Sequence, residues 1–375
     1  MAVVSSNLLS REVSDLCLGK PPLRSLSATA TIAEALSAFK KLGESFLSVW
    51  TTNGDVSGSD LSCIGKVCMV DVICFLCKDE NLASPANALN AHLSVLIPKI
   101  PGLVRHLEPN ASLSEAFDLI LQGAQNLIIP IQTSRKKLHQ KPTSNRPNNR
   151  EYCWITQEDL IRYLLNSIGL FSPTPANPIN SLNLIDNQNI LALNYDDPAS
   201  SALPLITQSL ISQTSVAVID GEGRLVGEIS PSTLNLCDET VAAAIATLSA
   251  GDLMAYIDYG GPQEDLVQLV KDRLEEKEKY KALMEFIEED LTTTTMMMSS
   301  DDESFGCGGK SGRLAVRSSE AIVCYPWSSL VAVMIQALAH RLSYVWVVEQ
   351  DGTLVGIVTF ASMLKVFRER LNTMA

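Results

Sequence analysis

Two apolar runs joined by a short polar turn recur along the chain, which is the pattern of a β-hairpin. The clearest copy joins residues 344–348 to residues 354–359 through Asp351 and Gly352. Aspartate followed by glycine between apolar runs is a strong hairpin signal, because glycine accepts the positive φ that a tight turn needs. The same pattern predicts three further hairpins, whose paired runs are 46–50 with 63–69, 126–131 with 152–156, and 212–218 with 225–230.

An amphipathic helix is predicted before each hairpin. Thr31 with Glu34, and Ser112 with Glu115, have the spacing of capping boxes, in which hydroxyl and carboxylate each accept a hydrogen bond from a backbone N–H. Apolar residues follow at helical spacing in both segments. Pro204 in the third copy fits only within the first turn of a helix. Each unit is therefore predicted to run β-α-β-β-α, which makes the fold an α/β repeat with helices covering small sheets.

Two halves are predicted on either side of a proline-rich linker at residues 172–178. The first half is residues 1–170, with repeats at about 13–78 and 89–167 and a polar loop at 133–150. The second half is residues 171–375, with repeats at about 178–240 and 249–371 and an insertion at about 258–320. The role of the insertion stays open.

Charge and hydropathy exclude two classes of partner. Lysine and arginine total 29 against 42 acidic residues, so the formal net charge is −13. Nucleic acids and anionic lipids both require clustered positive charge. The apolar runs at 67–77 and 330–348 are interrupted by Asp71 and Gln336, so neither reaches the roughly 20 apolar residues of a membrane span. We therefore expect neither nucleic acid nor a membrane as a partner.

The N-terminal residues and the cysteines indicate a compartment. Residues 1–15 contain one arginine, Arg11, and no basic segment before an apolar core, so no import signal is expected. The nine scattered cysteines are an odd number, which indicates free thiols in a reducing environment. A cytoplasmic protein is the expectation.

The end of the fourth copy, residues 354–359 after Asp351 and Gly352, resembles the consensus end of a CBS (cystathionine-β-synthase-type) domain, and residues 250–254 resemble the start of one. Three other segments are similar to plant four-repeat CBS proteins of the CBSX group, namely 13–23, 123–128 and 319–324. The resemblance covers nearly the whole chain except the two variable loops. It implies four CBS repeats paired into two Bateman modules, with clefts between the paired sheets.

The resemblance also implies a ligand, because many CBS clefts bind AMP, ATP or related adenosyl compounds. The ribose contact in such clefts is a Thr/Ser-x-x-Asp motif after a strand, where one ionised carboxylate accepts from two adjacent hydroxyls. The start of the following helix favours phosphate. Carried over to this chain, the motif is complete as Thr156 with Asp159, and in the first repeat Cys68 replaces the hydroxyl before Asp71.

The third and fourth repeats keep only the hydroxyl of this motif, at Ser230 and Thr359. We therefore expect the first module to be the better nucleotide site, with Asp159 contributing more than Asp71. The same pattern is also an ordinary helix cap, so that role stays open for each of these residues. His340 and Arg341 are expected to complement the end of a helix rather than to reach a phosphate.

Catalytic and metal chemistry have little support in the sequence. Cys74 and Cys77 form one Cys-x-x-Cys pair, but no second pair or histidine cluster completes a zinc site. Three-residue spacing on an apolar helix instead suits small buried side chains. No glycine-rich phosphate loop or nucleophile elbow is present, so we expect no enzyme activity, no required cofactor and no bound metal.

The leading functional hypothesis is a non-catalytic regulatory protein that senses an adenine nucleotide and regulates an unidentified protein partner. Nucleotide occupancy would act through its differential affinity for two arrangements of the repeats. The alternative is a CBS scaffold, or a subunit similar to the gamma subunit of a kinase, with vestigial nucleotide sites. The identity of the nucleotide, the partner and the oligomeric state, including a homodimer, stay open.

Overall fold

The computed structural model describes residues 10–53, 60–131, 150–258, 264–276 and 319–374. Almost all of the predicted polar loop at 133–150 and most of the predicted insertion at 258–320 lie outside these residues. The described part contains four copies of one unit, each with a strand, a helix, a β-hairpin and a closing helix. The predicted β-α-β-β-α repeat is therefore confirmed.

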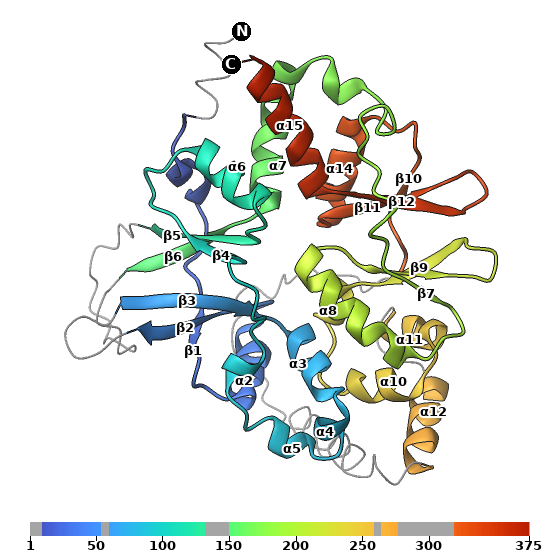
Figure 1. The fold of residues 1–375 in the computed structure, drawn as a ribbon. Helices are drawn as coiled ribbons and strands as arrows, with labels where there is room; N and C mark the ends of the chain where they lie inside the picture. The colour runs from blue at the N-terminus through green and yellow to red at the C-terminus, as the bar shows by residue number, and fades with distance from the viewer. Residues whose placement is uncertain (1–9, 54–59, 132–149, 259–263, 277–318, 375) are drawn as a thin grey trace, which may run out of the picture.

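The first module holds the first two repeats (Figure 1). Repeat 1 consists of β1 (Ser25–Ser27), α2 (Ile32–Leu42), β2 (Leu47–Asn53), β3 (Asp60–Val67) and α3 (Met69–Leu76). Repeat 2 consists of β4 (Val104–His106), α6 (Leu113–Leu121), β5 (Asn126–Ile131), β6 (Glu151–Ile155) and α7 (Gln157–Asn166). The short helices α4 (Asp79–Leu82) and α5 (Pro85–Ala88) connect the two repeats, and 3-10 turns lie at Val13–Cys17, Leu93–Val95, Ile168–Phe171 and Thr174–Ala176.

The second module repeats the arrangement. Repeat 3 consists of β7 (Ala192–Asn194), a 3-10 turn (Ala199–Ser201), α8 (Ala202–Ser212), β8 (Val216–Ile219), β9 (Leu225–Ile229) and α9 (Pro231–Leu234). Repeat 4 consists of β10 (Val323–Cys324), α14 (Leu330–His340), β11 (Tyr344–Val348), β12 (Leu354–Thr359) and α15 (Phe360–Met374). Between them lie α10 (Val241–Thr247), α11 (Ala250–Ile257) and α12 (Glu264–Glu275).

The predicted start signals explain where the helices begin. At α2, Thr31 Oγ1 accepts from Glu34 N at 3.2 Å, and Thr31 N donates to Glu34 Oε2 at 2.7 Å, which is a complete capping box. At α6, Ser112 Oγ accepts from Glu115 N at 3.2 Å. Pro204 lies in the first turn of α8, where its missing N–H costs no helical hydrogen bond.

Every described sheet has the same three-stranded topology. The first strand of each repeat is parallel to the second, and the second is antiparallel to the third. The sheets of repeats 1 and 2 pack together through Trp50, Cys63, Ile128 and Trp154. Those of repeats 3 and 4 pack through Ala217, Tyr344, Trp346 and Ile357. These two pairings are the Bateman modules that the family resemblance implies.

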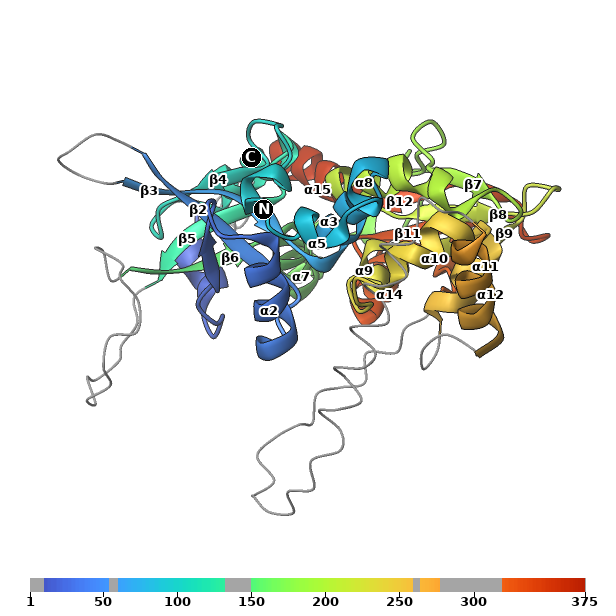
Figure 2. The ribbon, with the colours of Figure 1, turned by 90° about the horizontal axis from the view of Figure 1, so that it is seen from below.

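The two modules also pack against each other through their helices. One hydrophobic core contains residues of repeats 1 and 3, and a second contains residues of repeats 2 and 4. Figure 1 shows the hairpins of the two modules pointing outward on opposite sides while the helices meet in the middle, and Figure 2 shows the modules side by side in a flattened body. The expected halves at 1–170 and 171–375 therefore share their cores across the boundary.

Candidate functional site

A cavity of about 770 Å³ lies where the four repeats meet, and we call it the central cavity. Ligand pockets in proteins have volumes of roughly 300–1,000 Å³. The volume of the central cavity lies within this range. Each repeat contributes to the wall, as do residues 95–104, which lead from repeat 1 into repeat 2. The polar and charged wall residues include Lys66, Cys68, Asp71, Lys78, Gln125, Thr156, Glu158, Thr214, Asn235, Arg341 and Ser343.

Asp71 lines the central cavity at the start of α3. Its Oδ2 atom accepts from Cys68 N at 2.8 Å and from Cys68 Sγ at 3.1 Å, so the thiol takes the place of the hydroxyl in a capping box. Asp71 Oδ1 has no hydrogen bond within the described part of the chain. Burial raises the pKa of Asp71, while the Cys68 hydrogen bonds and Lys66 oppose the rise. Asp71 therefore caps α3 through Oδ2, and its Oδ1 has no hydrogen-bond partner among the described residues.

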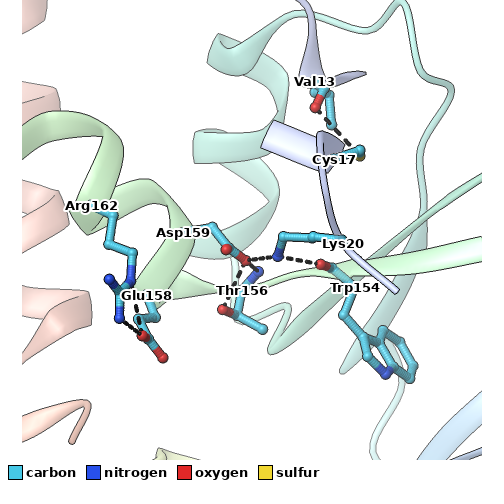
Figure 3. Close-up of polar contacts among 8 residues, drawn as sticks. All are labelled: Val13, Cys17, Lys20, Trp154, Thr156, Glu158, Asp159 and Arg162. Atoms are coloured by element: carbon cyan, nitrogen blue, oxygen red, sulfur yellow. Dashed lines mark hydrogen bonds and ion pairs between the residues drawn. The ribbon is translucent and has the colours of Figure 1, made fainter. Parts of the chain in front are cut away.

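Asp159 has a different environment, although it also caps its helix. Its Oδ2 atom accepts from Thr156 N at 2.8 Å and from Thr156 Oγ1 at 3.1 Å. The ammonium of Lys20 lies 2.6 Å from the same oxygen and also donates to Trp154 O at 2.7 Å (Figure 3). Thr156 is among the residues that line the central cavity, whereas Asp159 is not. The carboxylate of the complete motif is thus already paired with a cation of this chain.

Ser230 and Thr359 are also helix caps. Ser230 is buried, and its Oγ accepts from Thr233 N at 3.1 Å and lies 2.7 Å from Ser232 Oγ. Thr359 Oγ1 accepts from Ser362 N at 3.2 Å. Neither residue is among those that line the central cavity. In all four repeats the motif therefore begins a helix, and only Cys68, Asp71 and Thr156 of the six expected site residues reach the cavity.

Arg341 is a cavity residue that the sequence did not single out as a ligand. It ends α14 in the left-handed conformation with φ 57°, and it lines the central cavity. Lys66 and Lys78 are further cations of the wall, and Lys66 Nζ lies 5.4 Å from the centre of the Phe46 ring. The sequence placed Arg341 at the end of a helix, as the structure does, but that position does not reveal which cavity the residue lines.

Several large apolar side chains in the wall of the central cavity are exposed. Phe46 is 39% exposed, Ile64 36%, Val95 50% and Ile100 43%, and all four line the cavity. Large apolar groups in contact with water mark binding sites when they are clustered. The cavity therefore combines an apolar wall with two carboxylates, Asp71 and Glu158, and several cations, which suits a ligand that has an aromatic base, a sugar and an anionic group.

Cys74 and Cys77 lie at the C-terminal end of α3. Burial raises the pKa of Cys74 to about 12 and raises that of Cys77 well above its usual value. Within the described ranges, no three His, Cys, Asp or Glu side chains are grouped as metal ligands. No helix in these ranges has the length and apolar character to cross a bilayer.

Comparison with known proteins identifies the family. A family model for the CBS domain matches residues 318–369, which lie in repeat 4. CBS domain-containing protein CBSX5 of Arabidopsis thaliana is 48% identical over 387 residues, covering 98% of each of the two chains. The chain belongs to the CBS domain-containing proteins. The resemblance to the CBSX group is thereby confirmed.

More distant relatives match over nearly the whole chain. CBSX6 of Arabidopsis thaliana is 26% identical, covering 96% of this CBS protein and 94% of CBSX6. The protein named SNF1-related protein kinase regulatory subunit gamma-like PV42b, also from Arabidopsis thaliana, is 22% identical over 98% of this chain and 97% of its own. Protein MJ1225 of Methanocaldococcus jannaschii has a solved structure with a TM-score of 0.56 and 15% identity, covering 95% of this chain and 100% of that one.

Proposed function

We propose that this CBS protein is a non-catalytic regulator that binds an adenine nucleotide in the central cavity and passes its occupancy to a protein partner. The observation that carries the proposal is the free Oδ1 of Asp71 in a cavity of about 770 Å³ that also holds cationic side chains. A free carboxylate oxygen accepts hydrogen bonds from ribose hydroxyls, and such charged hydrogen bonds are the stronger ones.

The remaining cavity groups complement the other parts of a nucleotide. The exposed apolar residues Phe46, Ile64 and Ile100 offer contact area for the base. Lys66, Lys78 and Arg341 provide positive charge for phosphates, and the guanidinium of Arg341 can bind a phosphate with two parallel hydrogen bonds. We therefore assign ribose recognition to Asp71 and phosphate recognition to the cations, with Thr156 and Cys68 as neighbouring polar contacts.

Regulation follows from the position of the central cavity at the junction of both modules. Asp71 and Thr156 belong to the first module, and Asn235 and Arg341 belong to the second. A ligand that contacts both modules stabilises the arrangement in which those contacts are made, so occupancy shifts the equilibrium between arrangements. A partner that binds one arrangement better would then respond to the nucleotide.

The second candidate is a scaffold with vestigial nucleotide sites, as in a subunit similar to a kinase gamma subunit. One observation favours it: all four motifs cap helices, and the complete one is also paired with Lys20. The two candidates differ in a single measurable property, which is the affinity of the purified chain for nucleotides.

Titration calorimetry of the full chain with AMP, ADP, ATP and GTP tests the proposal. We expect micromolar or tighter binding of at least one adenine nucleotide, weakened about tenfold or more by Asp71→Asn, because two charge-assisted hydrogen bonds become neutral. Asp252→Asn is the matched control, since Asp252 is also the third residue of a helix but does not line the cavity. Absence of binding, or equal affinity of the Asp71 variant, would favour the scaffold.

A further inference from the structure

The N-terminal residues 10–23, which we call the strap, cross repeat 2 before entering the first strand of repeat 1. Val13 N donates to Ala111 O at 2.9 Å, and Leu23 N donates to Tyr152 O at 2.8 Å. Between these points Lys20 bonds to Trp154 O and pairs with Asp159. The strap is thus held to β6 and α7 by both backbone and side-chain contacts.

Each repeat has an equivalent crossing, in which the segment leading into one repeat lies against the hairpin of its module partner. In three repeats, the hairpin residue that faces the crossing segment is a glycine. The crossing is so close that a Cβ added to this glycine would meet a neighbour within 3 Å. That Cβ would lie 2.7 Å from Ile97 Cδ1 at Gly65, 2.8 Å from Ser319 O at Gly227, and 2.5 Å from Ile185 Cγ2 at Gly356. Only repeat 2 has a side chain at this position, and it is Cys153.

The strap presents a second cysteine to Cys153. Cys17 ends the turn Val13–Cys17, is half-buried, and packs against the core cluster that contains Cys153. Cys17 Sγ donates to Val13 O at 3.6 Å, and Cys17 and Cys153 are near enough for each thiol to shift the pKa of the other. The position that elsewhere holds glycine is therefore a cysteine of β6, and the strap that crosses it has its own cysteine in the same core cluster.

The two thiols differ in reactivity. The hydrogen bond from Cys153 and the nearby Lys20 lower the pKa of Cys17 against the opposing effects of burial and Asp159. The pKa of Cys153 is raised, because its hydrogen bond to Cys17 and burial both disfavour its ionised form. Burial likewise raises the pKa of Cys63, Cys74 and Cys324. Cys17 is therefore the more nucleophilic thiol of the pair, and Cys153 is placed to react with it second.

We propose that Cys17 and Cys153 are a redox site that forms a reversible disulfide, with a peroxide as oxidant and a dithiol as reductant. The Cys17 thiolate attacks one oxygen of the peroxide, the O–O bond breaks, and a sulfenic acid and hydroxide are formed. The sulfur of Cys153 then attacks the Cys17 sulfur, the S–O bond breaks, and water leaves with the proton of Cys153. Two thiols are oxidised and one peroxide is reduced to two waters.

The disulfide bonds the strap covalently to β6 beside the Lys20–Asp159 ion pair. In the reduced protein the strap is held by non-covalent contacts and can open locally, whereas in the oxidised protein it cannot leave repeat 2. The modification is independent of nucleotide binding, because Cys17 and Cys153 are not among the residues that line the central cavity.

Peptide mapping of the full chain tests this site. Cleavage after arginine and lysine places Cys17 in the peptide 12–24 and Cys153 in the peptide 151–162, each with a single cysteine. After limited hydrogen peroxide and alkylation, we expect these two peptides joined with the loss of two hydrogens, and separated again by dithiothreitol. A Cys17 that reaches the sulfinic acid unpaired, or that links to another cysteine, would overturn the proposal.

Variants give a second, independent readout. Cys17→Ser and Cys153→Ala should each abolish the joined peptides, while Cys324→Ser, which removes a buried thiol of repeat 4, should leave them intact. Peroxide should also raise the Tm of the wild type, because the disulfide restricts the unfolded chain, but not the Tm of Cys17→Ser. An equal rise in the Tm of both proteins would contradict a Cys17–Cys153 bond. If a variant fails to fold, the peptide mapping of the wild-type protein still tests the proposal.

Discussion

Single residues in this protein have dual roles, and their neighbours decide which role dominates. Asp71 and Asp159 occupy the same motif position and form the same capping bonds to the backbone three residues before them. Lys20 pairs with Asp159, while one oxygen of Asp71 stays without a partner in the described structure. The first arrangement fixes a segment of the chain, and the second leaves a carboxylate available to a ligand.

The Lys20–Asp159 pair is expected to contribute to stability rather than to nucleotide affinity. Its side chains are 25% and 19% exposed, so the pair is neither fully solvated nor fully desolvated. Asp159→Ala also removes a helix cap, and should lower the free energy of unfolding by about 1–2 kcal/mol. Urea unfolding of Asp159→Ala, Lys20→Met and the double variant measures the pair, and additive effects of the two changes would show that no coupling exists.

Glu228 makes the stability of the second module depend on pH. It is 3% exposed and accepts from Tyr344 Oη at 2.8 Å and from Trp346 Nε1 at 2.6 Å. Burial raises the pKa of Glu228 to about 7 from 4.5. Because the pKa is raised in the folded state, folding favours the protonated form. This stabilisation is therefore complete below pH 4.5 and is lost as the pH rises through 7.

Glu228→Gln should remove this pH dependence. Between pH 5 and pH 8 the wild type should lose on the order of 2 kcal/mol of unfolding free energy relative to the variant. Guanidinium unfolding of both proteins across this range is the measurement. Parallel stability curves for the two proteins would contradict a raised pKa at Glu228.

At the scale of elements, the close crossing of each lead-in segment over its partner hairpin holds a module together. Gly356 of β12 lies under Ile185 and Asp186, and a Cβ added to it would approach Asp186 O to 2.8 Å. Gly356→Ala should therefore destabilise the protein by about 1–3 kcal/mol through overpacking. Gly221→Ala is the control, since nothing lies within 4 Å of its Cβ position. Equal Tm values for the two variants would show that the crossing tolerates a side chain.

Local elements were predictable from the sequence because their signals are local. The capping box of Thr31 and Glu34, the Asp-Gly turn at Asp351, and the alternation of apolar runs each lie within a few residues of the structure they specify. The four hairpins and their preceding helices followed from these signals, and their order carried the family resemblance.

The site could not be predicted in the same way because its parts converge from distant segments. Asp71 and Arg341 line one cavity although they belong to the first and fourth repeats. Lys20 pairs with Asp159 although it precedes repeat 1 in the sequence and Asp159 belongs to repeat 2. Motif completeness ranks Asp159 above Asp71, whereas we propose the reverse order because Lys20 pairs with Asp159. Spacing along the chain contains no information about that ion pair.

At the scale of the whole molecule, the two modules form one unit around the central cavity. Arg368 Nη2 pairs with Asp118 Oδ1 at 2.9 Å, and Lys40 Nζ pairs with Glu239 Oε1 at 2.7 Å, so ion pairs link repeat 4 to repeat 2 and repeat 1 to repeat 3. The hydrophobic cores cross the same junction. In the proposed function, a ligand in the cavity would contact this shared junction, and its binding would be coupled to the arrangement of the modules.

The most direct test of this account is the order of two variants in one binding titration. Calorimetry with the tightest adenine nucleotide should show that Asp71→Asn weakens binding about tenfold or more, while Asp159→Asn leaves the Kd within about twofold of the wild type. The reason is that Asp71 has a free oxygen in the central cavity and Asp159 is occupied by Lys20. A larger loss in Asp159→Asn than in Asp71→Asn would contradict the account.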